Sequence, residues 1–172
     1  DPTIDVHVQR VIYGGQNMFK HSTYYFSQSF IEQNSLTQDA IAHRIATMKG
    51  FLKSDTAPNP EEWDQHWASL GKTDVSFASI HSHIKKAIKN HESLLRDNPE
   101  IEWDYVVLQS WRDVSDQPNQ AYVRYATKLA EIAKAQNAEV ILYMTSPETQ
   151  NEDSVVEPYN VASADRDTAV GR

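Results

Sequence analysis

The sequence contains no cysteine, and this absence excludes disulfide bonds, thiolate metal sites and cysteine nucleophiles. Glycine is scarce, at five residues in 172, and no Gly-x-Gly-x-x-Gly or Walker pattern is present. A phosphate-binding loop of either kind is therefore not expected. No apolar run approaches the roughly 20 residues that a helix needs to cross a bilayer, so we expect no membrane partner.

Basic residues are also in short supply. Sixteen Lys and Arg stand against 24 Asp and Glu, which gives a formal net charge of −8. This surplus of negative charge disfavours nucleic acid as a partner. The hydrophobic content of 40% and the charged content of 23% are ordinary for a globular protein. A chain of 172 residues is long enough for one domain with its own core.

The clearest strand signal lies in residues 103–110. An apolar run from Tyr105 to Leu108 has acidic residues before it and polar residues after it. Such a run is typical of a strand buried on both faces of a parallel sheet. Ligands of these sheets bind beyond the carboxyl ends of the strands. Gln109 and Ser110 lie at that end, so we expect functional residues there.

The rest of the chain alternates between strand and helix patterns. Two further strands are predicted, one over residues 4–13 and one over residues 138–144. A helical or loop insertion occupies about residues 54–74, and its helix begins at Pro60. This order favours a parallel sheet covered by helices. The other predicted helices cover residues 17–28, 31–52, 75–95 and 119–137.

The first predicted strand ends at the paired glycines Gly14 and Gly15. Paired glycines permit positive φ and a close approach of the backbone. They indicate either an ordinary turn or a backbone N–H donor aimed at an anion. His21 and Ser22 suggest a base beside a nucleophile, but adjacent residues of a helix do not face each other. The histidines do not have the spacing of metal ligands, and we predict no metal site.

Tryptophans supply the candidate substrate-binding residues. Trp63 and Trp67 share a face of the insertion helix because they are four residues apart. They indicate either a helix clamped to the body by two indoles or a lid on which a sugar stacks. Trp111 and Arg112 follow the central strand and are placed to line a pocket rim. Arg112 would hold a substrate carboxylate or make an ordinary surface ion pair.

Three segments together resemble the SGNH (GDSL-type) hydrolase family, in particular a bacterial branch with a Gly-Gly turn and a Leu-Gln pair. They are residues 4–21, with the glycine pair and His21, residues 103–109, and residues 138–147. The resemblance implies a three-layer α/β/α sandwich with a parallel, flavodoxin-like sheet. It also implies ester hydrolysis by a serine nucleophile with a histidine base and an aspartate. The substrate would be a small-molecule ester, for example an acylated carbohydrate, and no cofactor is expected.

The resemblance assigns the oxyanion hole to two positions. Gly15, or alternatively Gly14, matches the glycine that supplies a backbone N–H. Gln109 matches the side-chain amide, although many family members have asparagine in that block. Asp113 lies nearer the usual asparagine position, but its carboxylate would repel an oxyanion. The carboxamide of Gln109 can instead donate a hydrogen bond to it.

The chain also departs from the family pattern. No Gly-Asp-Ser or Gly-Asn-Ser motif lies near a first strand, and no Asp-x-x-His follows residue 147. We therefore expect residues 1–172 to form a single partial SGNH-hydrolase-like domain, inactive alone, that supplies oxyanion-hole and pocket residues of a serine esterase. The remaining segments of the same enzyme would complete the active site. Without the family's first strand, the edges of the strands at residues 4–13 and 103–110 would be exposed.

Two other functions stay open. One is a non-catalytic α/β domain that binds carbohydrate or another ligand and stacks sugars on Trp63, Trp67 and Trp111. The other is an unrelated flavodoxin-like domain that holds a phosphate at Gly14 and Gly15. The sequence leaves the compartment undetermined, and a periplasmic or secreted parent protein is compatible with it.

Overall fold

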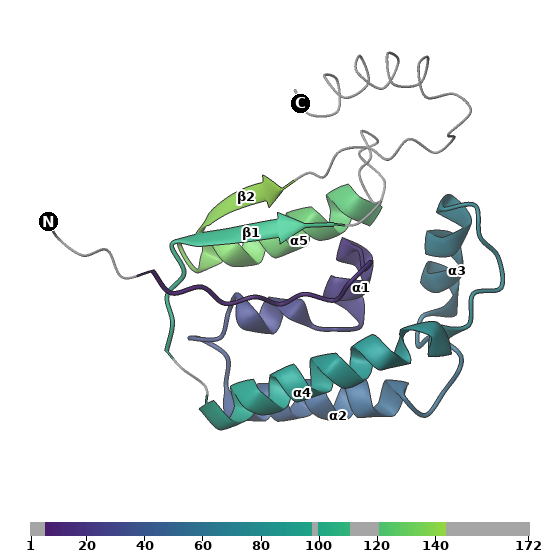
Figure 1. Ribbon diagram of the computed structural model, residues 1–172, viewed down its shortest axis with the longest axis horizontal. Coiled ribbons are helices and arrows are strands. Elements are labelled where there is room, and N and C mark those ends of the chain that lie inside the picture. The colour runs from purple at the N-terminus through teal and green to yellow at the C-terminus, as the bar shows by residue number, and fades with distance from the viewer. Residues whose placement is uncertain (1–5, 98–99, 111–120, 144–172) are drawn as a thin grey trace, which may run out of the picture.

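The computed structural model describes residues 6–97, 100–110 and 121–143, and the protein is a mixed α/β structure (Figure 1). Trp111, Arg112 and Asp113 lie outside the described residues. Within these residues, no helix combines the length and the apolar character required to span a membrane. The elements are α1 (Met18–Thr23), the 3-10 helix η1 (Ser27–Phe30), α2 (Gln38–Phe51), α3 (Pro60–Ser69), the 3-10 helix η2 (Phe77–Ile80), α4 (His81–Asp97), β1 (Tyr105–Gln109), α5 (Ala121–Ala135) and β2 (Glu139–Tyr143).

The sheet of the described chain consists of β1 and β2, joined through α5. The two strands are parallel, from Tyr105 opposite Glu139 to Gln109 opposite Tyr143, which confirms both predicted strands and their direction. Alternate residues of β1 face opposite sides. Leu108 is 5% exposed, whereas Val107 is 59% exposed. The described residues therefore cover one face of β1, and the architecture they establish is α/β.

The strand predicted over residues 4–13 is not formed in the described part of that stretch. Residues 6–13 are extended but pair with no strand. Val6 and Val8 are 71% and 64% exposed, and the side chain of Tyr13 is buried. The alternation of apolar and polar residues predicted a strand, and this prediction is wrong for the described residues. The segment forms no strand here because a strand requires a hydrogen-bonded neighbour.

The helical body is built around the packing of α2 against α4 (Figure 1). The side of α2 that faces α4 and the core is apolar, and Ile41, Ile45 and Met48 are all buried there. The helix begins at Gln38, later than predicted, because the Thr37 side chain caps it by accepting a hydrogen bond from the backbone N–H of Ala40. In α4, the core side is formed by Ile84, Ala87, Ile88, His91 and Leu94.

The helix predicted over residues 17–28 is broken into α1 and η1. Phe26 adopts a left-handed backbone with φ of 46°, which an α-helix cannot accommodate. Its ring stacks on Phe51 at a centroid distance of 6.3 Å. The break turns the chain so that η1 contributes Ser29 and Phe30 to the core.

Helix α3 forms the predicted insertion and begins at Pro60 as expected. Trp63 is 3% exposed, and its indole N–H donates to the Val75 carbonyl at 2.7 Å. Trp67 meets Trp63 edge to face, with ring centroids 5.5 Å apart. The Trp63 indole therefore clamps α3 to the body of the protein.

Candidate functional site

The turn at Gly14 and Gly15 lies at the same end of the molecule as the carboxyl end of β1 (Figure 1). The link between them is a hydrogen bond from the backbone N–H of Met18 to the Ser110 hydroxyl, at 3.3 Å. Both of these residues are buried. We refer to Gly14, Gly15, Gln109 and Ser110 as the rim. The structure thus brings together the two regions in which the sequence predicts oxyanion donors.

The glycine turn is well defined. The Gln16 N–H donates to the Tyr13 carbonyl at 3.2 Å, and Gly15 has a φ of 67°, the left-handed value that glycine tolerates best. A Cβ atom placed on either glycine would meet nothing within 4 Å. Among the described residues, neither glycine N–H donates to an acceptor. Gly14 and Gly15 are exposed, so within the described residues their N–H groups are unpaired donors at the surface.

Gln109 is the last residue of β1 and is exposed. Its side chain lies on the same uncovered face of the strand as Val107, opposite Leu108. In the described part of the chain, the carboxamide makes no hydrogen bond, so its N–H groups are available to a ligand. Ser110, one residue further on, lies on the covered side and is used to hold α1.

A buried lysine of α1 contacts Trp67 of α3. Lys20 is 4% exposed, and its ammonium lies 4.6 Å from the centre of the Trp67 ring. After burial, the Lys20 charge is the next cause that lowers the pKa of His21 and of His66, each to about 4.

His66 carries an unused donor in this region. The side-chain oxygen Oδ1 of Asn17 caps α1 by accepting from the backbone N–H of Lys20, so the side-chain NH₂ of Asn17 faces His66 Nε2, 2.9 Å away. His66 Nε2 is therefore the acceptor, and the imidazole proton lies on Nδ1. In the part of the chain that the structure describes, that nitrogen is buried without a hydrogen-bond partner. Unsatisfied buried donors are rare in proteins and are often found where a ligand or water binds.

The histidine next to the turn has a serine partner that the sequence did not suggest. His21 Nδ1 lies 2.8 Å from the Ser27 hydroxyl, and the ring contacts Tyr13. The expected failure of His21 to pair with Ser22 agrees with the structure, in which the Ser22 hydroxyl is buried without a partner. The pairing with Ser27 depends on the break at Phe26, which no local sequence signal predicts.

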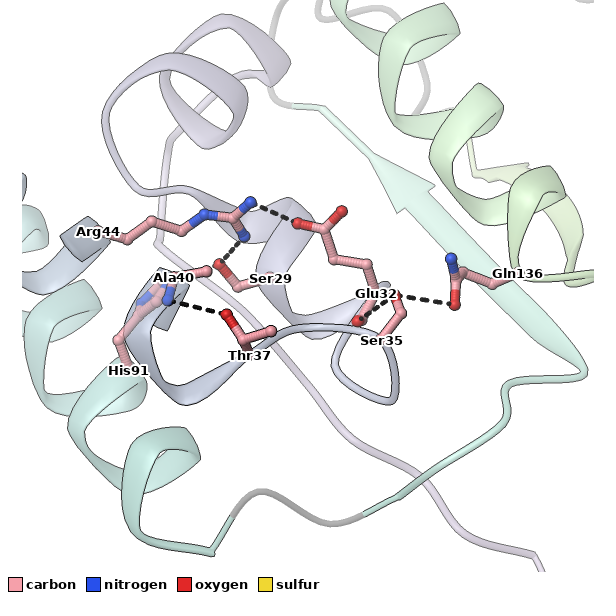
Figure 2. Close-up of polar contacts among 8 residues, drawn as sticks. All are labelled: Ser29, Glu32, Ser35, Thr37, Ala40, Arg44, His91 and Gln136. Carbon is pink, nitrogen blue, oxygen red and sulfur yellow. Dashed lines mark hydrogen bonds and ion pairs between the residues drawn. The ribbon is translucent and has the colours of Figure 1, made fainter. Parts of the chain in front are cut away.

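A second serine–histidine contact lies inside the helical body (Figure 2). The His91 Nδ1–H donates to the Ala87 carbonyl at 2.8 Å, so Nε2 accepts from the Ser29 hydroxyl, also at 2.8 Å. Arg44 donates to the same hydroxyl and pairs with Glu32 at 2.6 Å. Ser29 and His91 are both 0% exposed. No substrate can reach them, and the network instead ties η1 to α2 and α4.

The predicted sugar-binding tryptophans are occupied by contacts within the protein. Trp63 is buried, as described above. The ring of Trp67 makes cation–π contacts with the ammonium groups of Lys20 and Lys72, which lie 4.6 and 5.4 Å from its centre. Trp111 and Arg112 lie outside the described residues. Neither described indole therefore offers a free face for a sugar.

The cavities and charged clusters of the described residues do not form a second candidate binding site. Cavities of about 240 and 310 Å³ open beside Trp103 and beside His7, both near the start of β1 and away from the rim. No group of three or more His, Asp or Glu among the described residues could hold a metal ion.

Comparison with known proteins adds no relatives. No protein-family model matches the chain, and neither a curated protein nor a solved structure matches it significantly. The function is therefore argued from the geometry of the rim.

Proposed function

We propose that this chain is the oxyanion-binding part of a serine ester hydrolase of the SGNH type, with a three-layer α/β/α architecture. The Gly15 N–H, or alternatively the Gly14 N–H, and the Gln109 carboxamide are the donors. The substrate is a small-molecule ester, for which an acylated carbohydrate is the first candidate. The observation that carries the proposal is the bond from Met18 to Ser110, which places the glycine turn and the end of β1 at one rim.

The chemistry of acyl transfer explains why these groups suit the role. Attack on an ester carbonyl creates a tetrahedral intermediate with a negatively charged oxygen, and N–H donors held in place stabilise that charge. Gly15 and Gln109 both have donors without acceptors among the described residues. The rim thus offers two directional donors to a developing negative charge.

The nucleophile is assigned to a remaining segment of the same enzyme. The pair formed by His21 and Ser27 is the accessible alternative, since both residues are half-buried. The pKa of His21 is lowered to about 4, far from the value near 7 that suits a general base at neutral pH. Its ring contacts are to aromatic residues rather than to an orienting carboxylate.

The proposal is tested by labelling with a fluorophosphonate, which reacts with activated serines. The parent protein should be labelled, and the isolated 172-residue chain should not. In the parent protein, Gln109→Ala should lower kcat for an aryl acetate by roughly 100-fold, the usual cost of removing one oxyanion donor. Gln136→Ala is the matched control, because Gln136 lies in the turn before β2, beside Trp103 and far from the rim.

Either of two results would overturn the proposal. A parent protein that hydrolyses no ester and takes up no label would exclude the hydrolase. Labelling of the isolated chain at Ser27 would show that the reactive serine lies within these residues.

A further inference from the structure

The glycine turn of the rim is a β-turn over residues 13–16, and its central peptide joins Gly14 to Gly15. The backbone N–H of Gln16 donates to the Tyr13 carbonyl at 3.2 Å, which closes the turn. Gly15 has a φ of 67°, whereas the φ of Gly14 is not positive. A negative φ followed by a positive φ is the pattern of a type II turn. The central peptide of this turn consists of the Gly14 carbonyl and the Gly15 N–H.

The direction of the central peptide decides which group the turn offers to a ligand. Because a peptide unit is planar and trans, the Gly14 carbonyl and the Gly15 N–H point in opposite directions. Type I and type II turns differ by a rotation of the central peptide through roughly half a turn. Glycine at both central positions permits either type. A flip would withdraw the Gly15 N–H and present the Gly14 carbonyl oxygen, which repels a negatively charged oxygen.

The side chain of Gln16 holds the central peptide in one direction. Its Nε2 donates to the Gly14 carbonyl at 3.3 Å. Its Oε1 accepts from the Tyr25 hydroxyl at 2.9 Å, and Tyr25 is 0% exposed. Because a hydroxyl donor fixes the oxygen end of the carboxamide, the NH₂ end faces the turn. We refer to these two hydrogen bonds as the Gln16 bridge.

His83 of α4 makes a second contact with the same carbonyl. Burial and two neighbouring lysine charges lower the pKa of His83, whereas a hydrogen bond with the Gly14 backbone raises it. A bond that raises the pKa of a histidine is donated by the ring, so its acceptor is the Gly14 carbonyl. The ring of His83 also packs edge to face against Tyr13, with centroids 6.5 Å apart. The carbonyl therefore faces the helical body, and the Gly15 N–H faces away from it.

We infer that Gln16 is a positioning residue of the rim, which holds the peptide between Gly14 and Gly15 so that its N–H and not its carbonyl faces the ligand. Tyr25 orients Gln16 through its hydroxyl. The backbone donor is thereby assigned to Gly15, because the Gln16 bridge fixes the peptide that carries the Gly15 N–H. The nature of the ligand, an oxyanion, rests on the proposed function, whereas the fixed direction of the peptide does not.

Gln16→Glu tests the bridge with a side chain of the same shape. A carboxylate still accepts from the Tyr25 hydroxyl, but it repels the Gly14 carbonyl and attracts the Gly15 N–H. The flipped turn should therefore predominate in this variant. In a type II turn, an α-proton of Gly14 lies close to the Gly15 amide proton and gives a strong nuclear Overhauser effect. In the ¹⁵N-labelled chain at neutral pH, Gln16→Glu should weaken this effect by roughly threefold or more.

The kinetic consequence is measured in the parent protein with an aryl acetate. Gln16→Glu should lower kcat by roughly tenfold and Gln16→Ala by roughly threefold, within the range that one net hydrogen bond contributes. KM should stay unchanged, because an oxyanion donor acts on the transition state and not on the bound ester. Tyr25→Phe keeps the buried ring but releases the Gln16 carboxamide, so kcat should fall by about twofold.

Gln136→Glu is the matched control. It introduces the same charge beside Trp103, away from the rim, and should alter neither the nuclear Overhauser effect nor kcat. Gln16 is only half-buried, so its variants should unfold at nearly the same urea concentration as the unmodified chain. A loss of kcat in a folded variant is then a change in the direction of the donor.

The possible outcomes separate the Gln16 bridge from the proposed function. A weaker nuclear Overhauser effect in Gln16→Glu, together with a parent protein that hydrolyses no ester, would support the bridge and exclude the hydrolase. An unchanged effect in a parent protein that hydrolyses esters would overturn the bridge and keep the hydrolase. A weaker effect with an unchanged kcat would also overturn the inference, because the Gly15 N–H would then not be the oxyanion donor.

Discussion

The helical body and the sheet of this protein differ in how completely they bury their apolar residues. In the helical body, Ile41 and Ile84 are 0% exposed. In the sheet, Val107 is 59% exposed and Ile141 is 46% exposed, although both belong to paired strands. The helical body therefore completes its core within the described residues, whereas the sheet leaves one face and one edge open. We expect stability to reside in the former and ligand binding in the latter.

Buried polar groups do not follow this contrast. Ser29 and His91 are fully buried in the helical body, and both are hydrogen-bonded. Among the described residues, however, His83 Nδ1 of α4 and Gln28 Oε1 of η1 are buried without a partner, as are His66 Nδ1 and Trp67 Nε1 of α3. A buried donor without a partner costs roughly 1–3 kcal/mol. The difference between the helical body and the sheet therefore lies in the burial of apolar residues and not in the pairing of polar ones.

Truncating one apolar side chain in the helical body and one in the sheet should give the largest difference in the free energy of unfolding. Ile84→Ala should lower the free energy of unfolding by about 3 kcal/mol, because it leaves a cavity in a closed core. Val107→Ala should cost under about 1 kcal/mol, because most of that side chain is already in water. Urea denaturation measures both. Equal losses would show that the sheet is closed in solution and would remove the contrast.

Acid should lower the free energy of unfolding because His21 and His66 are buried in their neutral form. Folding lowers the pKa of His21 and of His66 from 6.5 to about 4, in each case chiefly through burial. The unfolded chain then binds more protons below pH 6.5, so stability is complete above that pH and falls as the pH drops toward 4. Between pH 7 and pH 5 we expect a loss of about 2 kcal/mol for the pair, after allowance for partial solvent screening.

The control for this pH dependence is the replacement of single histidines. His66→Gln should reduce the slope of unfolding free energy against pH between 5 and 7. His43→Gln, on the exposed side of α2, should leave the slope as it is. A slope that is unaffected by His66→Gln would mean that this imidazole is solvated or paired with an anion in solution.

A smaller effect is expected from the hydrogen-bond network of the helical body (Figure 2). Ser29→Ala removes the hydroxyl shared by His91 and Arg44, and should cost about 1.5 kcal/mol because two buried groups lose a partner. Ser35→Ala, at the exposed end of the same figure, should cost less than about 0.5 kcal/mol. If the two variants unfold at the same urea concentration, the buried network contributes no net stability.

Local sequence patterns predicted the elements whose cause is local. The apolar run of β1 and the proline at the start of α3 produced the expected elements. The strand over residues 4–13 failed because its formation requires a partner that the described residues do not supply. The helix over residues 17–28 failed because the backbone of Phe26 is set by its packing on Phe51 and not by its own propensity.

The candidate site was predictable to a similar extent. The glycine pair correctly indicated a positive φ, which Gly15 adopts, and the turn lies at the same end as the carboxyl end of β1, although the strand expected before the turn is not formed in the described residues. The clamp formed by Trp63 is one of the two alternatives that the sequence offered, and the hydrogen bond from its indole N–H to the Val75 carbonyl decides between them. The contact between His21 and Ser27 was hidden in the sequence, because it follows from the break at Phe26.

The smallest expected effect separates the two glycines of the rim. Gly15→Ala should cost about 1 kcal/mol, because a φ of 67° is strained for alanine even though a Cβ there meets nothing within 4 Å. Gly14 lacks a left-handed φ, so Gly14→Ala should be neutral or slightly stabilising, through a less flexible unfolded chain. Urea denaturation of the two variants measures the difference. Equal costs would mean that the turn changes shape in solution, and the Gly15 N–H would then lose its fixed direction toward a ligand.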